Sequence, residues 1–153
     1  MTPVPEAAAT PDLASFGIPE TVGSWHLVGE AQDFNTSGPT GAIITEAGGD
    51  PTNVQDLFVQ ASAGSDTLTF DALRTPGTSF EAFVAAAAPR IAALGTTQRS
   101  SRSVAGWMVI RYATPPDYGD LPRTLDYASR GDVILTFGNW TDEQLAGFLA
   151  AWP

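Results

Sequence analysis

The alternation of apolar and polar residues predicts strands along most of the chain. Such alternation is typical of a strand with one buried face. Gly-, Pro-, Asp- and Ser-rich turns separate the stretches, and Gly131 supplies the positive φ that a tight turn before the last strand requires. We expect strands within 24–34, 42–45, 56–62, 67–73, 106–113, 125–128 and 133–138, with 96–103 as either an edge strand or a loop.

A first helix is predicted from Thr78, because Thr78 and Glu81 have the spacing of a capping box. Gly95 is placed to end this helix. Pro89 lies inside it and removes one backbone hydrogen bond, so we expect a kink or two abutting helices there. The apolar positions at helical spacing are Phe80, Phe83, Val84, Ala87, Ile91 and Leu94.

A second helix closes the chain. Thr141 and Gln144 form another capping box, and Trp140 is placed to pack against Leu145 as a hydrophobic staple. One face of this helix carries the apolar residues Leu145, Phe148, Leu149 and Trp152.

These elements predict an α+β domain. We expect an antiparallel sheet of about six or seven strands with two helices packed on one face. The length of 153 residues and the apolar content of 43% suit a single domain, 15–153. Residues 1–14 are rich in Pro, Ala and Thr, and we expect them to form a flexible leader.

Charge is distributed unevenly along the chain. Residues 1–73 contain ten acidic side chains and no basic one, whereas residues 74–153 contain seven acidic residues and seven Arg, which gives the net charge of −10. Nucleic acid is therefore excluded as a partner, because its phosphates bind clustered Lys and Arg. No apolar run reaches the length that a membrane helix needs, so we expect no membrane insertion of this chain.

The chain has no cysteine and a single histidine, His26, which limits its chemistry. A Ser/His/Asp triad would need His26 beside a nucleophile, and no G-x-S-x-G motif occurs. There is no phosphate-binding loop or dinucleotide fingerprint, and no set of ligands has metal-site spacing. We predict no catalytic, metal-binding or cofactor-binding residue and no cofactor. A hydrolase that uses two carboxylates distant in sequence stays open.

Four features of the second half resemble a known type of bacterial domain. They are Val104-Ala105-Gly106, Tyr127, Gly131-Asp132-Val133 and Asp142-Glu143-Gln144-Leu145. This layout resembles uncharacterised secreted or lipoprotein-type domains of high-GC bacteria. Residues 124–153 are also similar to a C-terminal domain of unknown function found on bacterial lipoproteins and anti-sigma factors. The resemblance implies an extracytoplasmic setting and an antiparallel sheet packed on helices, and it implies no catalytic residue.

We therefore predict a non-enzymatic binding or interaction domain that is secreted or tethered to a membrane. The expected partner is a protein, an envelope polymer or a small apolar ligand. We expect the binding surface to include Glu46, Asp50, Asp56, Trp107 and Tyr118. Two alternatives stay open, a carboxylate-dependent hydrolase and a purely structural surface module. An acidic cleft would favour the hydrolase, and a featureless convex sheet would favour the structural module.

Overall fold

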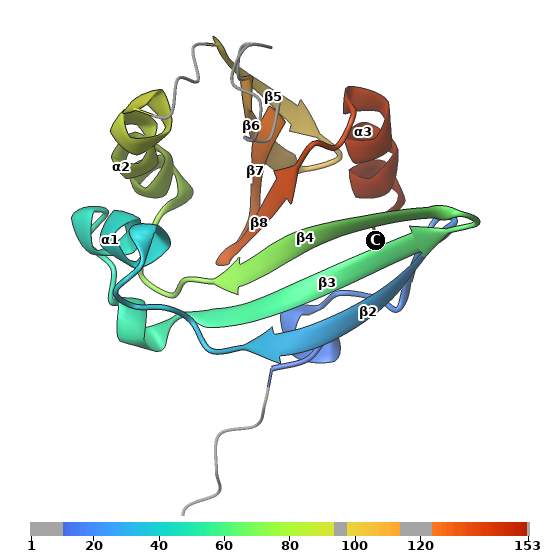
Figure 1. The fold of residues 1–153 in the computed structure, drawn as a ribbon, viewed down its shortest axis with the longest axis horizontal. Coiled ribbons are helices and arrows are strands. Elements are labelled where there is room, and N and C mark those ends of the chain that lie inside the picture. Colours follow the sequence, from blue (N-terminus) through green and yellow to red (C-terminus); the bar gives the residue numbers. More distant parts are fainter. Residues whose placement is uncertain (1–10, 94–97, 114–123, 153) are drawn as a thin grey trace, which may run out of the picture.

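The computed structural model describes residues 11–93, 98–113 and 124–152, and its centre is one antiparallel sheet of eight strands (Figure 1). Each strand pairs with its neighbours through backbone hydrogen bonds in the order β1-β2-β3-β4-β8-β7-β6-β5. The strands are β1 (Thr21–Val22), β2 (Trp25–Gln32), β3 (Gln55–Ala63), β4 (Asp66–Arg74), β5 (Gln98–Val104), β6 (Trp107–Ala113), β7 (Thr124–Arg130) and β8 (Val133–Gly138).

The pairing of β4 with β8 joins two halves of the sheet that are separate in sequence. Phe70 lies opposite Phe137, and Arg74 lies opposite Val133. On one side of this junction are β1 to β3, and on the other are β5 to β7. Within each half, neighbouring strands are also consecutive in sequence, so β4–β8 is the only pairing of non-consecutive strands among those described.

The described residues form three α-helices, which lie on the two faces of the sheet. They are α1 (Pro39–Glu46), α2 (Phe80–Ala93) and α3 (Asp142–Ala151), and two short 3-10 turns, η1 (Ala14–Phe16) and η2 (Pro51–Asn53), accompany them. Figure 1 shows α1 and α2 together on one side of β5 to β8 and α3 on the opposite side. None of the helices that the structure describes has the length and apolar character required to span a bilayer.

The face of the sheet that carries α3 holds the larger core. Strand residues of one alternation, such as Leu57, Phe70 and Leu135, belong to one buried cluster with Phe148 and Leu149 of α3. Phe16 and Ile18, from the segment around η1, extend this core toward the β1 edge. Phe148 contacts the rings of Phe70, Phe137, Trp140 and Trp152 edge-on, with centroids 5.2 to 6.2 Å apart.

The opposite face is covered by α1 and α2 and has a smaller core. Ile43 and Ile44 of α1 and Phe83 and Val84 of α2 are buried in it. The strand residues of this second core are Ile110, Tyr112, Tyr127 and Ile134. They alternate with residues of the α3 face, as the period of two in a strand requires.

The predicted fold class was wrong in two respects, although the α+β content and the antiparallel sheet are as expected. The sheet has eight strands rather than six or seven, and three helices cover both faces rather than two helices covering one. β7 and β8 are apolar on both alternations, since Tyr127 and Ala128 are both buried, as are Ile134 and Leu135. Such strands must be covered on both sides, and the prediction did not use this constraint.

One predicted strand is a helix. Ala42–Thr45 lies within α1, which begins at Pro39, a residue favoured at the first helical position because its φ is already helical. A four-residue apolar run does not distinguish a strand from a helix by its period alone.

Two details of α2 also differ from expectation. Its first turn is capped by Ser79, whose Oγ accepts a hydrogen bond from the N–H of Ala82 at 3.1 Å, whereas the hydroxyl of Thr78 is buried without a partner. The helix is continuous through the exposed Pro89, so it is not divided into two abutting helices, and the alternative of a kink at Pro89 stays a prediction. The predicted end at Gly95 lies outside the described residues.

Several local predictions are confirmed. Thr141 and Gln144 form the capping box of α3, with reciprocal hydrogen bonds of 3.1 and 3.0 Å. Gly131 has a φ of 64° in the turn between β7 and β8. The segment 96–103 contributes β5, an edge strand whose described residues include the charged Arg99 and Arg102. Charged edges of this kind oppose pairing with another chain.

An ionic network attaches α3 to the sheet. Arg111 of β6 binds the fully buried carboxylate of Asp126 of β7 through two hydrogen bonds of 2.8 and 2.9 Å. The same guanidinium reaches Asp142 at the start of α3 at 2.8 Å, and Arg102 of β5 binds Asp142 at the same distance. A carboxylate in the first turn also interacts favourably with the helix dipole.

Candidate ligand-binding site

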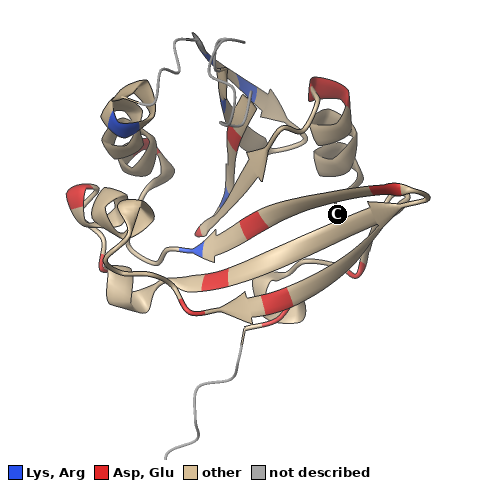
Figure 2. Ribbon diagram, viewed as in Figure 1, with Lys and Arg blue, Asp and Glu red and all other residues tan. Residues whose placement is uncertain are grey.

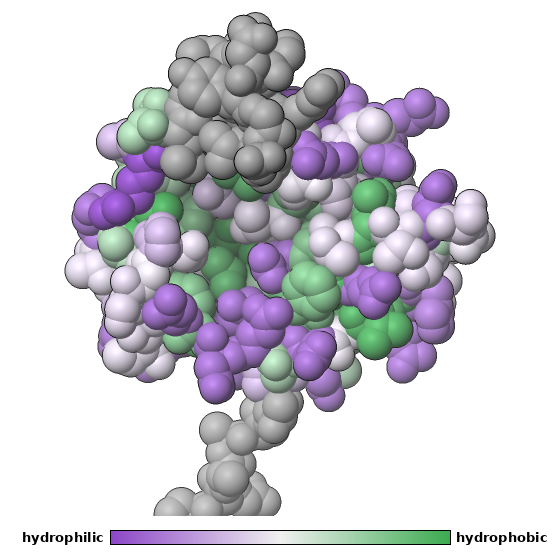
Figure 3. All heavy atoms as spheres, in the orientation of Figure 1, coloured by the Kyte–Doolittle hydropathy of each residue, from purple (hydrophilic) through white to green (hydrophobic). Residues whose placement is uncertain are grey.

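The face that carries α1 and α2 contains an apolar groove, which we call the α2 groove. It has a volume of about 570 Å³ and lies between α2 and the strands β5 to β7. In Figure 3 a hollow lined by hydrophobic atoms is visible beside α2. The lining residues are Phe80, Glu81, Val84, Ala85, Arg99, Met108, Ile110 and Ser129.

The α2 groove is open because small side chains line it at positions where larger ones would fill the space between α2 and the sheet. Ala85 faces it from α2, and Ser129 lies opposite Met108 in the β6–β7 pairing. Met108 is consequently 47% exposed, and Met108 and Val28 are the large hydrophobic residues that stay exposed within the described part of the chain. The polar groups at the groove are those of Glu81, Arg99 and Ser129.

A second, smaller hollow on the same face is polar, and we call it the acidic cavity. Its volume is about 110 Å³. Asp71 of β4 lies opposite Thr136 of β8, which in turn lies opposite Tyr127 of β7, so these side chains form one row across the sheet. Asp56 of β3 is the diagonal neighbour of Asp71, because Phe58 is the residue opposite Asp71. The lining residues are Phe34, Thr40, Asp56, Asp71, Leu73, Phe83, Tyr127 and Thr136.

The acidic cavity opens toward the loop before α1. An adjoining hollow of about 230 Å³ shares Phe34, Thr40 and Asp56 with it. The other residues that line this hollow are Gln32, Asp33, Asn35, Gly38 and Pro39. The two hollows therefore adjoin at Asp56, near the end of β2.

The electrostatics of the acidic cavity are unusual. Burial, and to a lesser extent the charge of Asp71, raise the pKa of Asp56 from 3.8 to about 6. Burial also raises the pKa of Asp71. One carboxylate oxygen of Asp56 is buried and accepts no hydrogen bond. Burial, followed by the proximity of Tyr112, raises the pKa of Tyr127 to about 12, so its hydroxyl stays neutral.

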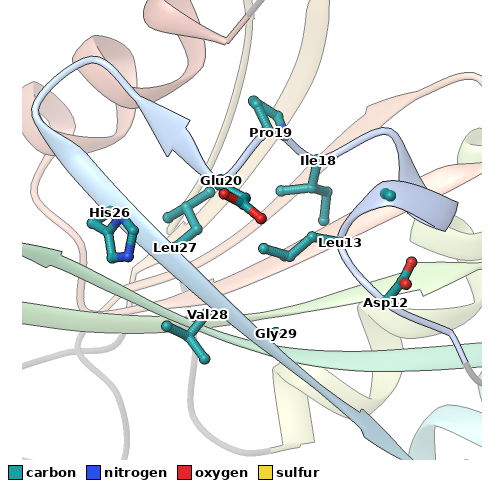
Figure 4. Close-up of a pocket in the computed structure, with 10 residues that line it drawn as sticks. Asp12, Leu13, Ile18, Pro19, Glu20, His26, Leu27, Val28 and Gly29 are labelled. Atoms are coloured by element: carbon teal, nitrogen blue, oxygen red, sulfur yellow. The ribbon is translucent and has the colours of Figure 1, made fainter.

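A third hollow lies at the β1 edge of the sheet and measures about 610 Å³ (Figure 4). β1 pairs with Trp25 and His26, and no other strand of the described residues lies along the outer edge of β2. Figure 4 shows side chains of β2 and of the segment around η1 lining this hollow. Its polar side chains Asp12, Glu20 and His26 are all exposed, so water solvates them and they require no ligand.

The residues predicted to form a binding surface are only partly brought together. Asp56 lines the acidic cavity, whereas Glu46 ends α1 and binds Arg90 of α2 at 2.7 Å. Asp50 caps η2 by accepting a hydrogen bond from the N–H of Thr52. Trp107 is 1% exposed and packs against Trp152 on the α3 face, so it is a core residue there. Tyr118 lies outside the described residues.

The prediction missed Met108, Asp71 and Tyr127 as site residues. The strand pattern alone contains a signal for Met108, since it shares a strand face with Ile110 and Tyr112. Asp71 is recognisable only once the β3–β4 register is known. Among the described residues, no three His, Cys, Asp or Glu side chains are grouped as a metal site requires.

Comparisons of this chain with protein-family models, with curated proteins and with solved structures found no match. Function must therefore be argued from the geometry of these hollows.

Proposed function

We propose that this chain is a non-enzymatic extracytoplasmic binding domain that takes a small apolar molecule in the α2 groove. The observation that carries the proposal is a groove of about 570 Å³ that leaves Met108 47% exposed. Sites for small molecules are concave, mostly apolar and of this size, with a few polar groups that orient the ligand. Methionine suits such a surface because its flexible thioether adapts to different shapes.

The size of the effect follows from the exposed area. Fully burying a methionine side chain contributes about 1.5 to 3 kcal/mol. Because Met108 is 47% exposed, a ligand that covers it gains about half of this, roughly 1 kcal/mol, which is about fivefold in affinity. A charge at position 108 would in addition be desolvated by the ligand, so its effect should exceed tenfold.

The test is titration with N-phenylnaphthylamine, a neutral apolar probe that fluoresces on leaving water. Saturable binding is expected for the unmodified chain. Met108→Asp should weaken it by about tenfold or more. Ala85→Trp, which fills the groove without adding charge, should also weaken it. Val28→Asp is the matched control, because Val28 is also apolar and is 58% exposed, but it lies on β2 and lines the hollow at the β1 edge rather than the α2 groove.

Equal weakening by Met108→Asp and Val28→Asp would mean that the probe binds exposed apolar surface in general, which would contradict the proposal. Unchanged binding in both groove variants would contradict it as well.

The extracytoplasmic setting rests on the resemblance of the second half to secreted domains. Detection of the chain in the cytoplasmic fraction of the source cells alone would disprove that part.

A hydrolase that uses Asp56 and Asp71 is not supported as a second function. The two residues do supply paired carboxylates near a hollow. However, their surroundings raise both pKa values, whereas an acid and base pair needs environments that separate them. The cavity of about 110 Å³ also lacks room for a sugar ring together with an attacking water.

A further inference from the structure

The acidic cavity holds two carboxylates without a compensating cation. Asp56 and Asp71 are both half-buried, and none of the ion pairs formed within the described residues involves either of them. One oxygen of Asp56 is buried without a hydrogen-bond partner. Carboxylates in protein interiors are normally paired or hydrogen-bonded, because burial of an unpaired charge is unfavourable.

A tyrosine side chain lines the same cavity. Tyr127 is 8% exposed and forms part of the cavity wall. The hydroxyl of the neighbouring Tyr112 is buried and has no hydrogen-bond partner among the described residues, whereas the hydroxyl of Tyr127 is not one of these buried unpartnered atoms.

Aromatic rings form part of the cavity wall. Phe34, Phe83 and Tyr127 line it, and the rings of Phe83 and Tyr127 are nearly perpendicular, at 87°, with centroids 5.2 Å apart. The faces of aromatic rings attract cations, and cages of such rings bind substituted ammonium groups. A cavity of about 110 Å³ has room for roughly four water molecules, which is the scale of such a head group.

We propose that the acidic cavity binds the ammonium head group of a small organic cation. Asp56 and Asp71 supply the negative charge, the aromatic rings contact the carbon atoms around the nitrogen, and the hydroxyl of Tyr127 accepts an N–H where the ligand has one. The rest of the molecule extends into the adjoining hollow beside Asp33. This site shares no lining residue with the α2 groove, so it goes beyond the proposed function and does not depend on it.

The site predicts binding that depends on pH. Because the pKa of Asp56 is raised to about 6, protonation near that pH removes one of the two negative charges and weakens cation binding. A bound cation should in turn lower the pKa of Asp56. Several other titratable or charged groups lie on the elements around Asp56. Those on the strands or next to them are Asp71 of β4, Glu30 of β2, Asp33 just after β2, Tyr112 of β6 and Tyr127 of β7. Those on the helices are the Glu46–Arg90 pair, which joins α1 to α2, and Glu81 of α2.

The experiment is a titration of the full chain with tetramethylammonium chloride and with methylammonium chloride, followed by amide chemical shifts. Sodium chloride at matched ionic strength is the reference. Above pH 6, saturable shifts should centre on residues 56, 71, 127 and 136. Asp56→Asn and Asp71→Asn should each weaken binding by about tenfold or more, as expected for the loss of one charged partner. Asp66→Asn, an exposed control at the far end of β4, should leave binding unchanged.

Tyr127→Phe separates the two probes. It should weaken methylammonium, which donates N–H hydrogen bonds, and leave tetramethylammonium unchanged, since that ion has none. Absence of saturable shifts with both ions would disprove the site, as would equal binding by Asp56→Asn and the unmodified chain. Tighter binding of calcium than of either ammonium ion would replace the proposal with a metal site. These outcomes are distinct from those of N-phenylnaphthylamine binding, which variants in a different set of residues test.

Discussion

At the scale of single residues, the carboxyl group of Asp56 depends most strongly on its surroundings. Burial first, and the charge of Asp71 second, raise its pKa from 3.8 to about 6. The folded chain therefore binds this proton more tightly than the unfolded chain. It follows that the associated stability is fully present below pH 3.8 and is lost as the pH rises to about 6.

Asp56→Asn should remove this pH-dependent loss. Since Asp56 is only half-buried, solvent screening reduces the effect to about 1 kcal/mol. The free energy of unfolding of Asp56→Asn should thus exceed that of the unmodified chain by about 1 kcal/mol above pH 6, and the excess should disappear below pH 3.8. Urea unfolding across this pH range measures the difference, with Asp66→Asn as the exposed control. A difference that does not vary with pH would contradict the assignment.

Single residues also show where sequence reasoning reached the site and where it did not. Asp56 was predicted as a binding residue because of its charge alone. In the structure it lines the acidic cavity together with Asp71 of the neighbouring strand. Leu73 is the residue directly opposite Asp56, and Asp71 lies two residues before Leu73. Trp107 was predicted to lie at a surface and is buried. An aromatic residue in a strand has the same local pattern whether its face is covered or open. Only the position of α3 determines which is the case.

At the scale of elements, α3 combines a local cap with burial in the aromatic core. Thr141→Ala removes the side-chain hydrogen bond to the N–H of Gln144, and it should lower the free energy of unfolding by about 1 kcal/mol. Phe148→Ala leaves a cavity among four aromatic rings and should cost about 3 to 5 kcal/mol. Chemical denaturation of both variants, with the exposed Asp66→Asn as control, checks this. A Phe148→Ala variant as stable as the control would mean that the buried face of α3 is assigned wrongly.

The attachment of β6 to β7 on the same face gives a second prediction. Arg111→Met would leave the carboxylate of Asp126, which is fully buried, without its bidentate partner. Breaking a buried pair in this way costs about 3 to 5 kcal/mol, whereas replacing both charges by apolar residues is often close to neutral. The double variant Arg111→Met/Asp126→Leu should therefore be more stable than Arg111→Met alone. If chemical unfolding shows the double variant to be less stable than Arg111→Met alone, the ionic network stabilises the fold through more contacts than the Arg111–Asp126 pair.

The elements themselves were predictable to different degrees. Long alternating stretches such as β3 and β4 were recognised because nine residues fix a period of two. The capping box of α3 was recognised because its hydrogen bonds are local. α1 was mistaken for a strand because its apolar run is short, and its helical start depends on Pro39, which is equally common in turns.

At the scale of the whole molecule, the placement of helices on both faces follows from the β4–β8 junction. That pairing joins residues 70–74 to residues 133–137 and puts β8, which is apolar on both alternations, in the middle of the sheet. Both hollows on the α1/α2 face arise where its helices cover the sheet incompletely. Sequence periodicity assigns residues to faces within one strand, but it does not show which strands are neighbours, so neither hollow was predictable.

Charge is also organised at this scale. Figure 2 shows acidic residues along β2 to β4 and on α1, and most basic residues on α2 and on the strands of the other half. With a net charge of −10, the molecule should repel nucleic acid and heparin and associate faster with a basic partner. Glu46 already pairs with Arg90, and Asp50 caps η2. The exposed Glu30 and Asp33 are therefore better positions at which to test the effect of the electrostatic potential on association.

The last prediction concerns the rate at which a short Arg-rich peptide associates with the chain. Neutralising Glu30 and Asp33 to Gln and Asn should slow association more than neutralising Glu81 and Glu143 to Gln, although each pair removes the same charge. Strands β2 to β4 carry a single Arg, Arg74 at the end of β4, so the first pair contributes more to the local potential. The difference in association rate between these two double variants should become smaller near 0.1 M salt, where the screening length is about 10 Å. Stopped-flow measurements at several salt concentrations check this. Equal slowing by both pairs would mean that net charge alone, rather than its distribution over the two halves of the sheet, governs encounter.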